Sequence, residues 1–271
     1  MKRLLFFFLL LLVLVGCGKQ ETSTNTTITT NTNEKANTSA NKTLVVGTTN
    51  ASPPTAFVKA EDNQVNGIMV DMMKEAGKKA GYDVKYEAMS FSSLISALQN
   101  HRIDLISAGM SYNEERAKIV SFTDYVYGFH EALVVPKGSQ VKSLEDLKGK
   151  KVGVAAGTIY VGFLEKSGIP MDVKVYEKTN QMLIELAQGR LDAMITDTPI
   201  VQYLMQQNPS NEVEIVKDYK PAFSLKMGFI TNHDQEDLRN KLNKAISEMK
   251  KDGTLEQIYK KWGIQKPEFI K

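Results

Sequence analysis

The chain of 271 residues has one cysteine, three histidines and little net charge. A single cysteine excludes a disulfide framework, so the folded part must be held together by its hydrophobic core. His101, His130 and His233 are scattered and lack the spacing of metal ligands, and we predict neither a metal nor a cofactor. The formal net charge of +3 gives no reason to expect a nucleic-acid partner.

An apolar run long enough to span a bilayer is also missing. Residues 4–13 are uniformly apolar behind Lys2 and Arg3, whereas a spanning helix needs ~20 residues. The length and the basic flank of this run are typical of a secretory signal peptide. The run leads into LVGC at residues 14–17. This string resembles the bacterial lipobox, in which the peptide is cut before a cysteine that receives a diacylglyceryl group. The alternative is that Cys17 is one more small residue of a signal peptide.

The segment after Cys17 is poor in large apolar side chains. Residues 18–42 consist mainly of Thr, Asn, Ser and Lys, and such a segment cannot bury enough surface to offset the entropy of ordering it. We interpret residues 1–16 as a signal peptide and residues 17–42 as a lipidated cysteine with a flexible tether; an interaction or glycosylated segment is the alternative. We therefore expect a protein held by lipid on the extracytoplasmic face of the cell membrane.

The remaining chain, residues 43–271, is long enough for two lobes. Short apolar runs alternate in it with amphipathic stretches, an order typical of an α/β protein whose mostly parallel sheets are flanked by helices. We expect strands at residues 44–46, 84–88, 103–107, 132–135, 151–155, 173–176 and 191–195. We expect helices at residues 67–80, 91–100, 158–166, 181–187, 234–250 and 254–262.

The chain also repeats a pattern. RIDLI at residues 102–106 follows Leu94 and Leu98 at the same spacing at which RLDAM at residues 190–194 follows Met182 and Leu186. Two copies of one helix–turn–strand unit indicate two similar lobes; the alternative is that any such unit in an α/β protein looks alike. Ligands bind beyond the carboxyl ends of strands in open α/β sheets. The loops at 107–111 and 196–199 should therefore face each other across a cleft.

Side chains in and after these loops are the candidates for ligand binding. Arg116 could hold a carboxylate by two parallel hydrogen bonds, or it could pair with a neighbouring glutamate at the surface. Asp197 could receive an ammonium group, or it could cap a helix that has Pro199 in its first turn. GVAAGT at residues 153–158 runs from a strand into a helix. Its amides and the Thr158 hydroxyl could bind a carboxylate.

Longer strings resemble a known family. SAGMSYNEER at residues 107–116, followed by VSFTD at 120–124, is similar to the AG-x-[ST]-x-x-x-E-R … FS-[DE] signature of family 3 solute-binding proteins. These are the polar-amino-acid receptors of ABC importers. The similarity continues through SLEDLKGKKVGV at 143–154, AGT at 156–158, LDAMITD at 191–197 and GT…IYKKW at 253–262.

The resemblance implies a two-lobed Venus-flytrap fold that closes on an amino acid and delivers it to ABC permease and ATPase subunits. It implies a monomeric binding protein rather than an enzyme. Residues 43–128 and 229–271 would form lobe 1, residues 129–228 lobe 2, and strands near 129–132 and 226–229 would cross between them. In the family, the arginine matching Arg116 clamps the ligand α-carboxylate and the aspartate matching Asp197 takes the α-amino group. The implied ligand-binding residues are Phe91, Ala108, Gly109, Ser111, Arg116, Thr158, Asp197 and Thr49.

The wall around the ligand side chain departs from the family pattern. The acidic residue usual near Thr49 and the aromatic residue usual near Ser52 are missing, and Ala155 stands where glutamine receptors carry a lysine. We therefore expect a neutral or weakly polar amino acid or derivative. Two other functions remain open: an enzyme resembling cyclohexadienyl dehydratases, and a ligand-sensing lipoprotein that is not linked to transport.

Overall fold

The structure of the chain, a computed structural model, describes residues 41–209 and 212–270. The expected signal peptide, Cys17 and all of the expected tether except its last two residues lie outside these ranges. Lys42, which the sequence analysis places in the tether, is the first residue of a strand. None of the helices within the described ranges is long and apolar enough to cross a membrane.

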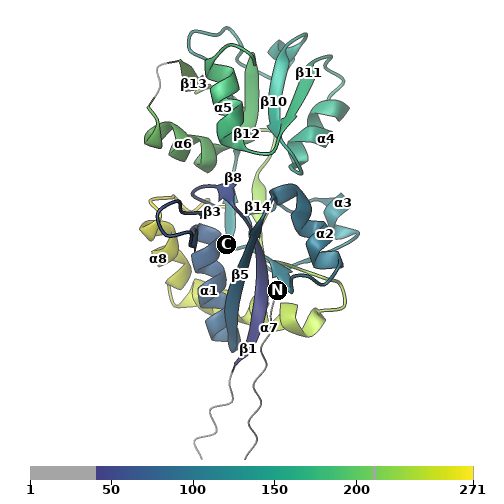
Figure 1. Ribbon diagram of the computed structural model, residues 1–271, viewed down its shortest axis with the longest axis vertical. Coiled ribbons are helices and arrows are strands. Elements are labelled where there is room, and N and C mark those ends of the chain that lie inside the picture. Colours follow the sequence, from purple (N-terminus) through teal and green to yellow (C-terminus); the bar gives the residue numbers. More distant parts are fainter. Residues whose placement is uncertain (1–40, 210–211, 271) are drawn as a thin grey trace, which may run out of the picture. The chain divides into compact units, whose positions relative to one another are not determined.

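The first lobe is built on a five-stranded sheet (Figure 1). Its elements are β1 (Lys42–Thr49), β2 (Ala51–Ser52), β3 (Ala56–Val58), β4 (Val65–Asn66), α1 (Ile68–Ala80), β5 (Tyr82–Met89), the 3-10 helix η1 (Phe91–Ser93), α2 (Leu94–Gln99), β6 (Leu105–Ile106), α3 (Glu114–Ala117), β7 (Ser121–Phe122), β15 (Ile230–Thr231), α7 (Glu236–Lys251) and α8 (Thr254–Lys261). The strand order is β5-β1-β6-β15-β7, and β2, β3 and β4 form a small separate sheet. β1 is parallel to β5 and β6, whereas β15 is antiparallel to β6 and β7.

The second lobe repeats this plan. Its elements are β9 (Glu131–Pro136), the 3-10 helix η2 (Glu145–Leu147), β10 (Lys151–Ala155), α4 (Ile159–Lys166), β11 (Asp172–Tyr176), α5 (Thr179–Ala187), β12 (Ala193–Asp197), α6 (Thr198–Gln207) and β13 (Val213–Ile215). The strand order is β11-β10-β12-β9-β13. β10 is parallel to β11 and β12, whereas β9 is antiparallel to β12 and β13. The two sheets are therefore mixed: the three strands joined by helices are parallel, and the strands connected to the other lobe are not.

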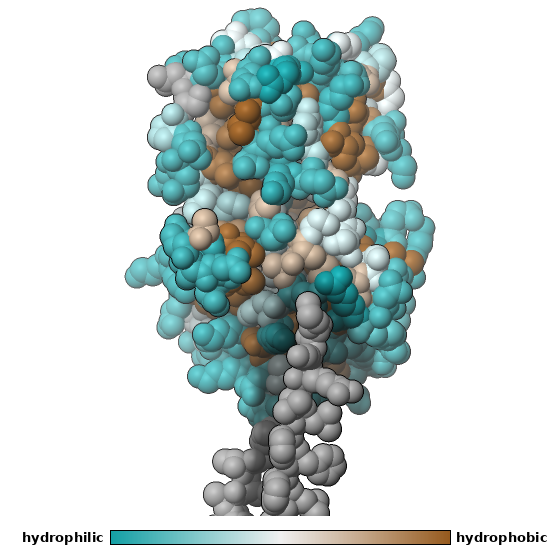
Figure 2. Space-filling view, viewed as in Figure 1, coloured by the Kyte–Doolittle hydropathy of each residue, from teal (hydrophilic) through white to brown (hydrophobic). Residues whose placement is uncertain are grey.

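Helices cover both faces of each sheet because side chains alternate along a strand. On β1, Leu44 and Val46 pack into a cluster shared with α1, α7 and α8, whereas Val45 packs into the cluster of α2. Figure 1 shows α1 and α8 on one side of β1 and α2 on the other. Hydrophilic residues cover most of the outer surface in the same view (Figure 2), so the apolar side chains of these elements lie mainly inside.

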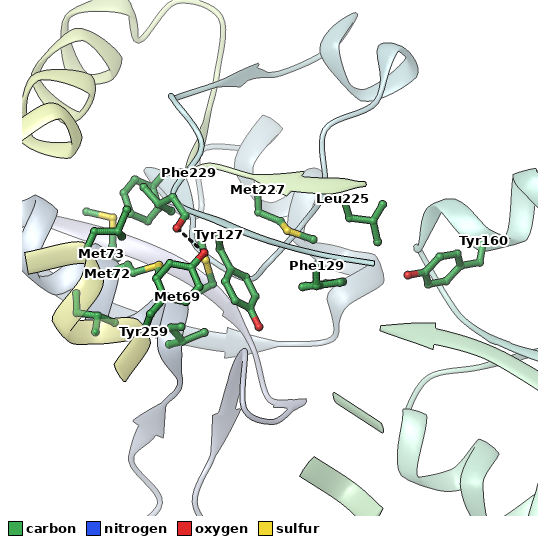
Figure 3. Close-up of a cluster of buried hydrophobic side chains, with 14 of the residues drawn as sticks. Met69, Met72, Met73, Tyr127, Phe129, Tyr160, Leu225, Met227, Phe229 and Tyr259 are labelled. Carbon is green, nitrogen blue, oxygen red and sulfur yellow. Dashed lines mark hydrogen bonds between the residues drawn. The ribbon is translucent and has the colours of Figure 1, made fainter. Parts of the chain in front are cut away.

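Two short strands cross between the lobes. β8 (Tyr127–Phe129) and β14 (Leu225–Met227) pair antiparallel, with Leu225 opposite Phe129. The first crossing strand was expected near residues 129–132, but Glu131 already begins β9 of the second sheet. The apolar cluster continues through this crossing, from the methionines of α1 past Tyr127 and Phe129 to Tyr160 of α4 (Figure 3). The two lobes thus share a hydrophobic core at the crossing.

The repeated helix–turn–strand unit has the same geometry in both lobes. The Asp104 carboxylate accepts a hydrogen bond of 2.7 Å from the Val45 amide in β1, and the Asp192 carboxylate accepts one of 2.7 Å from the Lys151 amide in β10. Each aspartate thereby fixes the turn before β6 or β12 to the neighbouring parallel strand. The loops that follow β6 and β12 consequently leave equivalent ends of the two sheets.

Candidate ligand-binding site

The loops after β6 and β12 line one cleft, as the repeat predicts. Ala108 and Gly109 come from the first loop, and Thr196 and Asp197 come from the end of β12. The empty space between these residues amounts to about 500 Å³ when the open mouth of the cleft is included. Gly109 has a positive φ of 70°, and a Cβ there would lie 2.3 Å from Thr55 Cγ2. Only glycine therefore fits at this turn without displacing its neighbour.

Arg116 is a buried cation rather than a surface one. It lies on α3, whose N-cap Asn113 accepts a hydrogen bond of 2.7 Å from the Arg116 amide, and the residue is 7% exposed. Nη1 donates to the carbonyl oxygen of Ser111 at 2.5 Å and to its Oγ at 3.1 Å. Nη2 donates to the carbonyl oxygen of Gly157, in the other lobe, at 2.7 Å. The neighbouring Glu115 pairs with Lys118 instead, so the surface-pairing alternative does not describe Arg116.

Burial sets the charge state of Arg116. Removal from water lowers the pKa of Arg116 to about 10, and the nearby charge of Asp197 partly offsets that shift. The guanidinium therefore stays protonated at neutral pH. Nη1 uses both of its hydrogens on Ser111, and Nη2 uses one on Gly157. A guanidinium held in this way can still attract a carboxylate by its charge and through its remaining N–H groups.

Asp197 is the N-cap residue of α6, but its side chain makes no capping hydrogen bond. Instead, Oδ1 accepts a hydrogen bond of 2.5 Å from the Tyr160 hydroxyl. Burial raises the pKa of Asp197 to about 6; the bond from Tyr160 and the charge of Arg116 act in the opposite direction, and Glu131 adds to the rise. The side chain is thus a carboxylate at neutral pH that is poorly hydrated and can accept hydrogen bonds from a cation.

Tyr160 is the main site residue that the sequence analysis missed. It is 2% exposed on α4 and lines the cleft. Burial and the neighbouring Asp197 raise the pKa of Tyr160 well above its ordinary value, so its hydroxyl stays protonated and acts as a donor. The available signal was its place two residues after Thr158, at the helix start already singled out, where its ring would face the same cleft.

The Gly-rich turn before α4 differs in detail from the expected anion site. Thr158 lines the cleft, but its hydroxyl donates to the carbonyl oxygen of Ala155 at 2.7 Å. Gly157, with a φ of 73°, presents its carbonyl oxygen to Arg116. The turn therefore provides an acceptor for the arginine of the other lobe. Two of the amides expected to bind an anion are already used, because Ala156 N–H donates to Tyr176 at 2.8 Å and Thr158 N–H donates to Ala155 at 3.4 Å.

The cleft has two adjoining parts; the part around Arg116 is called the inner part and the other the outer part. The inner part is lined by Arg116 and Ser111 together with Ile159, Leu225 and Met227. The outer part alone is lined by Ser52, Thr55, Ala108, Ala155, Ala156, Glu177, Thr179, Thr196 and Ile200. Both parts share Phe91, Gly109, Thr158, Tyr160 and Asp197.

One predicted site residue lies elsewhere. Thr49 is 2% exposed at the end of β1, where it pairs with Met89, and it lines neither part of the cleft. Ser52 and Thr55, from the loop just after it, line the cleft instead. The other seven predicted residues, Phe91, Ala108, Gly109, Ser111, Arg116, Thr158 and Asp197, are brought together there.

The chain is similar to known proteins in sequence and in fold. Residues 44–265 match the model of bacterial extracellular solute-binding proteins, family 3. The arginine-binding extracellular protein ArtP of Bacillus subtilis is 34% identical over 230 residues, which are 83% of this chain and 87% of that protein. The L-cystine-binding protein TcyJ of Escherichia coli is 32% identical over 81% of this chain and 82% of its own length. A solved structure of an ancestral arginine-binding protein bound to arginine superposes with a TM-score of 0.76 at 40% identity, covering 81% of this chain and 97% of that one.

Proposed function

Because the chain belongs to the bacterial extracellular solute-binding proteins of family 3, we propose that it captures a free amino acid between its lobes for an ABC importer. The observation that carries the proposal is the pair of opposite charges in the inner cleft. Arg116 comes from the first lobe and Asp197 from the second, and both line the same space. An amino acid presents the complementary pair, a carboxylate and an ammonium group on one carbon atom.

In the proposed complex, the ligand carboxylate binds Arg116 and the ligand ammonium group binds Asp197. Ser111 and Thr158 provide additional polar contacts, and the Phe91 ring packs on the ligand. The relatives support this assignment, since the proteins named for arginine and L-cystine bind compounds that share the α-carboxylate and the α-ammonium group. Because the two charges come from different lobes, the ligand favours the closed arrangement.

Binding measurements test this proposal. The full-length protein, purified in detergent, should show a higher melting temperature with one or a few L-amino acids, because a ligand that binds only the folded state stabilises it. Arg116→Ala and Asp197→Ala should each raise Kd about 30-fold or more, since each leaves the opposite charge buried without its partner. If both variants bound like the parent, the pocket assignment would be wrong.

We further propose that Cys17 carries a lipid that anchors the protein, and that the closed form docks on a membrane permease as a monomer. The support is the short apolar run of residues 4–13 before the cysteine and the family. Cys17→Ser should move the protein from the membrane to the soluble fraction. Deletion of the gene should abolish uptake of the identified amino acid, and uptake should return with the parent gene but not with Arg116→Ala.

An enzyme is the second candidate, and one observation favours it: a carboxyl group with a pKa near 6 in a cleft suits proton transfer. Incubation with prephenate or arogenate distinguishes the two, because an enzyme would consume these compounds and a binding protein would not. A sensory lipoprotein would bind the amino acid equally well, but its loss would leave uptake unchanged.

A further inference from the structure

The outer part of the cleft contains a charge that the backbone of an amino acid does not need. Among the described residues that line the outer part, Asp197 and Glu177 are the only charged side chains, and none of these residues is basic. Asp197 also lines the inner part, where Arg116 lies, whereas Glu177 lines only the outer part. Glu177 therefore faces the space left for the side chain of a ligand whose α-carbon groups bind in the inner part.

Contacts on both sides hold Glu177 at the cleft. It follows β11, whose last residue, Tyr176, accepts a hydrogen bond of 2.8 Å from the Ala156 amide of the Gly-rich turn. Its Oε2 accepts a hydrogen bond of 3.3 Å from the Ser92 hydroxyl of the first lobe. Both side chains are exposed, so this hydrogen bond joins the second lobe to the first at a solvent-accessible position.

Glu177 has no cationic partner among the described residues. None of the ion pairs within residues 41–209 and 212–270 includes it. The next residue, Lys178, lines a different cavity, beside β3 and β5. The negative charge is therefore directed at the cleft without a cation of the protein to neutralise it.

We propose that Glu177 determines the specificity of the site by binding a cationic nitrogen group, a guanidinium or an ammonium, at the end of the ligand side chain. The proposal rests on the proposed function for the inner part of the cleft. With Asp197 paired to the ligand ammonium group, Glu177 leaves a negative charge in the outer part, which repels an anionic side chain and attracts a cationic one. Phe91 lines both parts, and its ring face can add a favourable contact to the same cation. This proposal differs from the expectation of a neutral side chain, which considered the positions of Thr49, Ser52 and Ala155 but not Glu177.

Titration calorimetry on the full-length protein with L-arginine, L-glutamine and L-glutamate tests this proposal. L-Glutamine has a shorter side chain that ends in a neutral amide. The parent should bind L-arginine about tenfold more tightly than L-glutamine and should not bind L-glutamate. Glu177→Gln should raise the Kd for L-arginine about tenfold, as expected for the loss of a charged hydrogen bond, and should leave the Kd for L-glutamine unchanged.

Glu165→Gln is the matched control. Glu165 is exposed on α4 of the same lobe and lines neither part of the cleft, so this variant makes the same charge change and should bind like the parent. The proposal is overturned if the parent prefers L-glutamine, or if Glu177→Gln weakens both ligands equally or neither. Binding of L-glutamine alone would overturn this proposal and leave the proposed function standing. A parent protein that binds no amino acid would overturn both.

Discussion

Arg116 and Asp197 are held in the charge states that burial disfavours. Loss of water lowers the pKa of Arg116 and raises that of Asp197, and each residue partly offsets the shift of the other. Arg116 is hydrogen-bonded to the carbonyl oxygens of Ser111 and Gly157 rather than to a carboxylate. A zwitterionic ligand supplies the missing opposite charge to both residues, so binding restores electrostatic interactions that folding removed.

Ligand affinity should therefore depend on pH through Asp197. Only the carboxylate can pair with an ammonium group, and the pKa of Asp197 is about 6. We expect Kd to be constant above pH about 7 and to rise, by at most about tenfold per pH unit, as the pH falls below 6. Calorimetry between pH 5 and pH 8 measures this. Tyr160→Phe removes a bond that favours the carboxylate, so the rise should begin at a higher pH; a Kd that does not change between pH 5 and pH 8 would contradict the assignment.

Protonation of Asp197, which weakens ligand binding, should stabilise the ligand-free protein. The pKa of Asp197 is higher in the folded chain, about 6, than its ordinary 3.8, so the folded state binds the proton more tightly. The stability gained from this proton is complete below pH about 4 and is lost as the pH rises through 6. Relative to the parent, Asp197→Asn should thus gain stability between pH 4 and pH 7, by up to about 3 kcal/mol. Urea unfolding of the parent and of Asp197→Asn at pH 4 and pH 7 measures the difference between their free energies of unfolding. The same difference at both pH values would contradict the prediction.

At the scale of the elements, the repeat depends on two glycines. Gly47 in β1 lies under Ile103, and Gly153 in β10 lies under Leu191. Both large residues occupy the same place in the repeat, directly after the arginine of the turn. A Cβ on Gly47 would lie 2.2 Å from Ile103 Cδ1, and one on Gly153 would lie 2.6 Å from Leu191 Cδ1. The missing side chain lets the turn pack directly on the neighbouring strand in each lobe.

This packing predicts coupled effects of substitution. Gly47→Ala should reduce the free energy of unfolding by about 1–3 kcal/mol, because Ile103 is buried and cannot move away freely. Ile103→Val removes the Cδ1 atom that would clash. The double variant should therefore be more stable than the sum of the two single changes predicts. Urea unfolding of the four proteins measures the coupling; strictly additive effects would show that the contact is not what limits stability.

At the scale of the molecule, the described structure brings the two lobes into contact across the cleft. Arg116 of the first lobe donates to Gly157 of the second, and Ser92 of the first donates to Glu177 of the second. A Cβ on Gly157 would lie 2.9 Å from Ser92 Cα. The approach of the lobes at this point thus requires the absence of a side chain at Gly157.

Gly157→Ala should hinder closure without removing a group that lines the cleft. We expect a Kd about tenfold higher and a smaller ligand-induced contraction in small-angle X-ray scattering. Gly189→Ala is the matched control. Gly189 has a similar φ, 71° against 73°, but a Cβ there has no atom within 4 Å, so only the local backbone strain is common to both. Equal affinities of the two variants would contradict a role for this contact in closure.

The sequence by itself indicated the strands and helices of the two repeated units and the two loops that line the cleft, but not β2, β3, β4, β13 or α3. These properties follow from local periodicity and turn chemistry, which neighbouring residues carry. The sequence did not decide whether Arg116 pairs at the surface or binds the ligand, or whether Asp197 caps a helix or binds the ligand. The tertiary structure decided against the first reading of each, because the outcome depends on Gly157 and Tyr160, which belong to another part of the chain. The tertiary structure also placed Glu177 in the lining of the outer part, since only folding brings the end of β11 opposite Ser92.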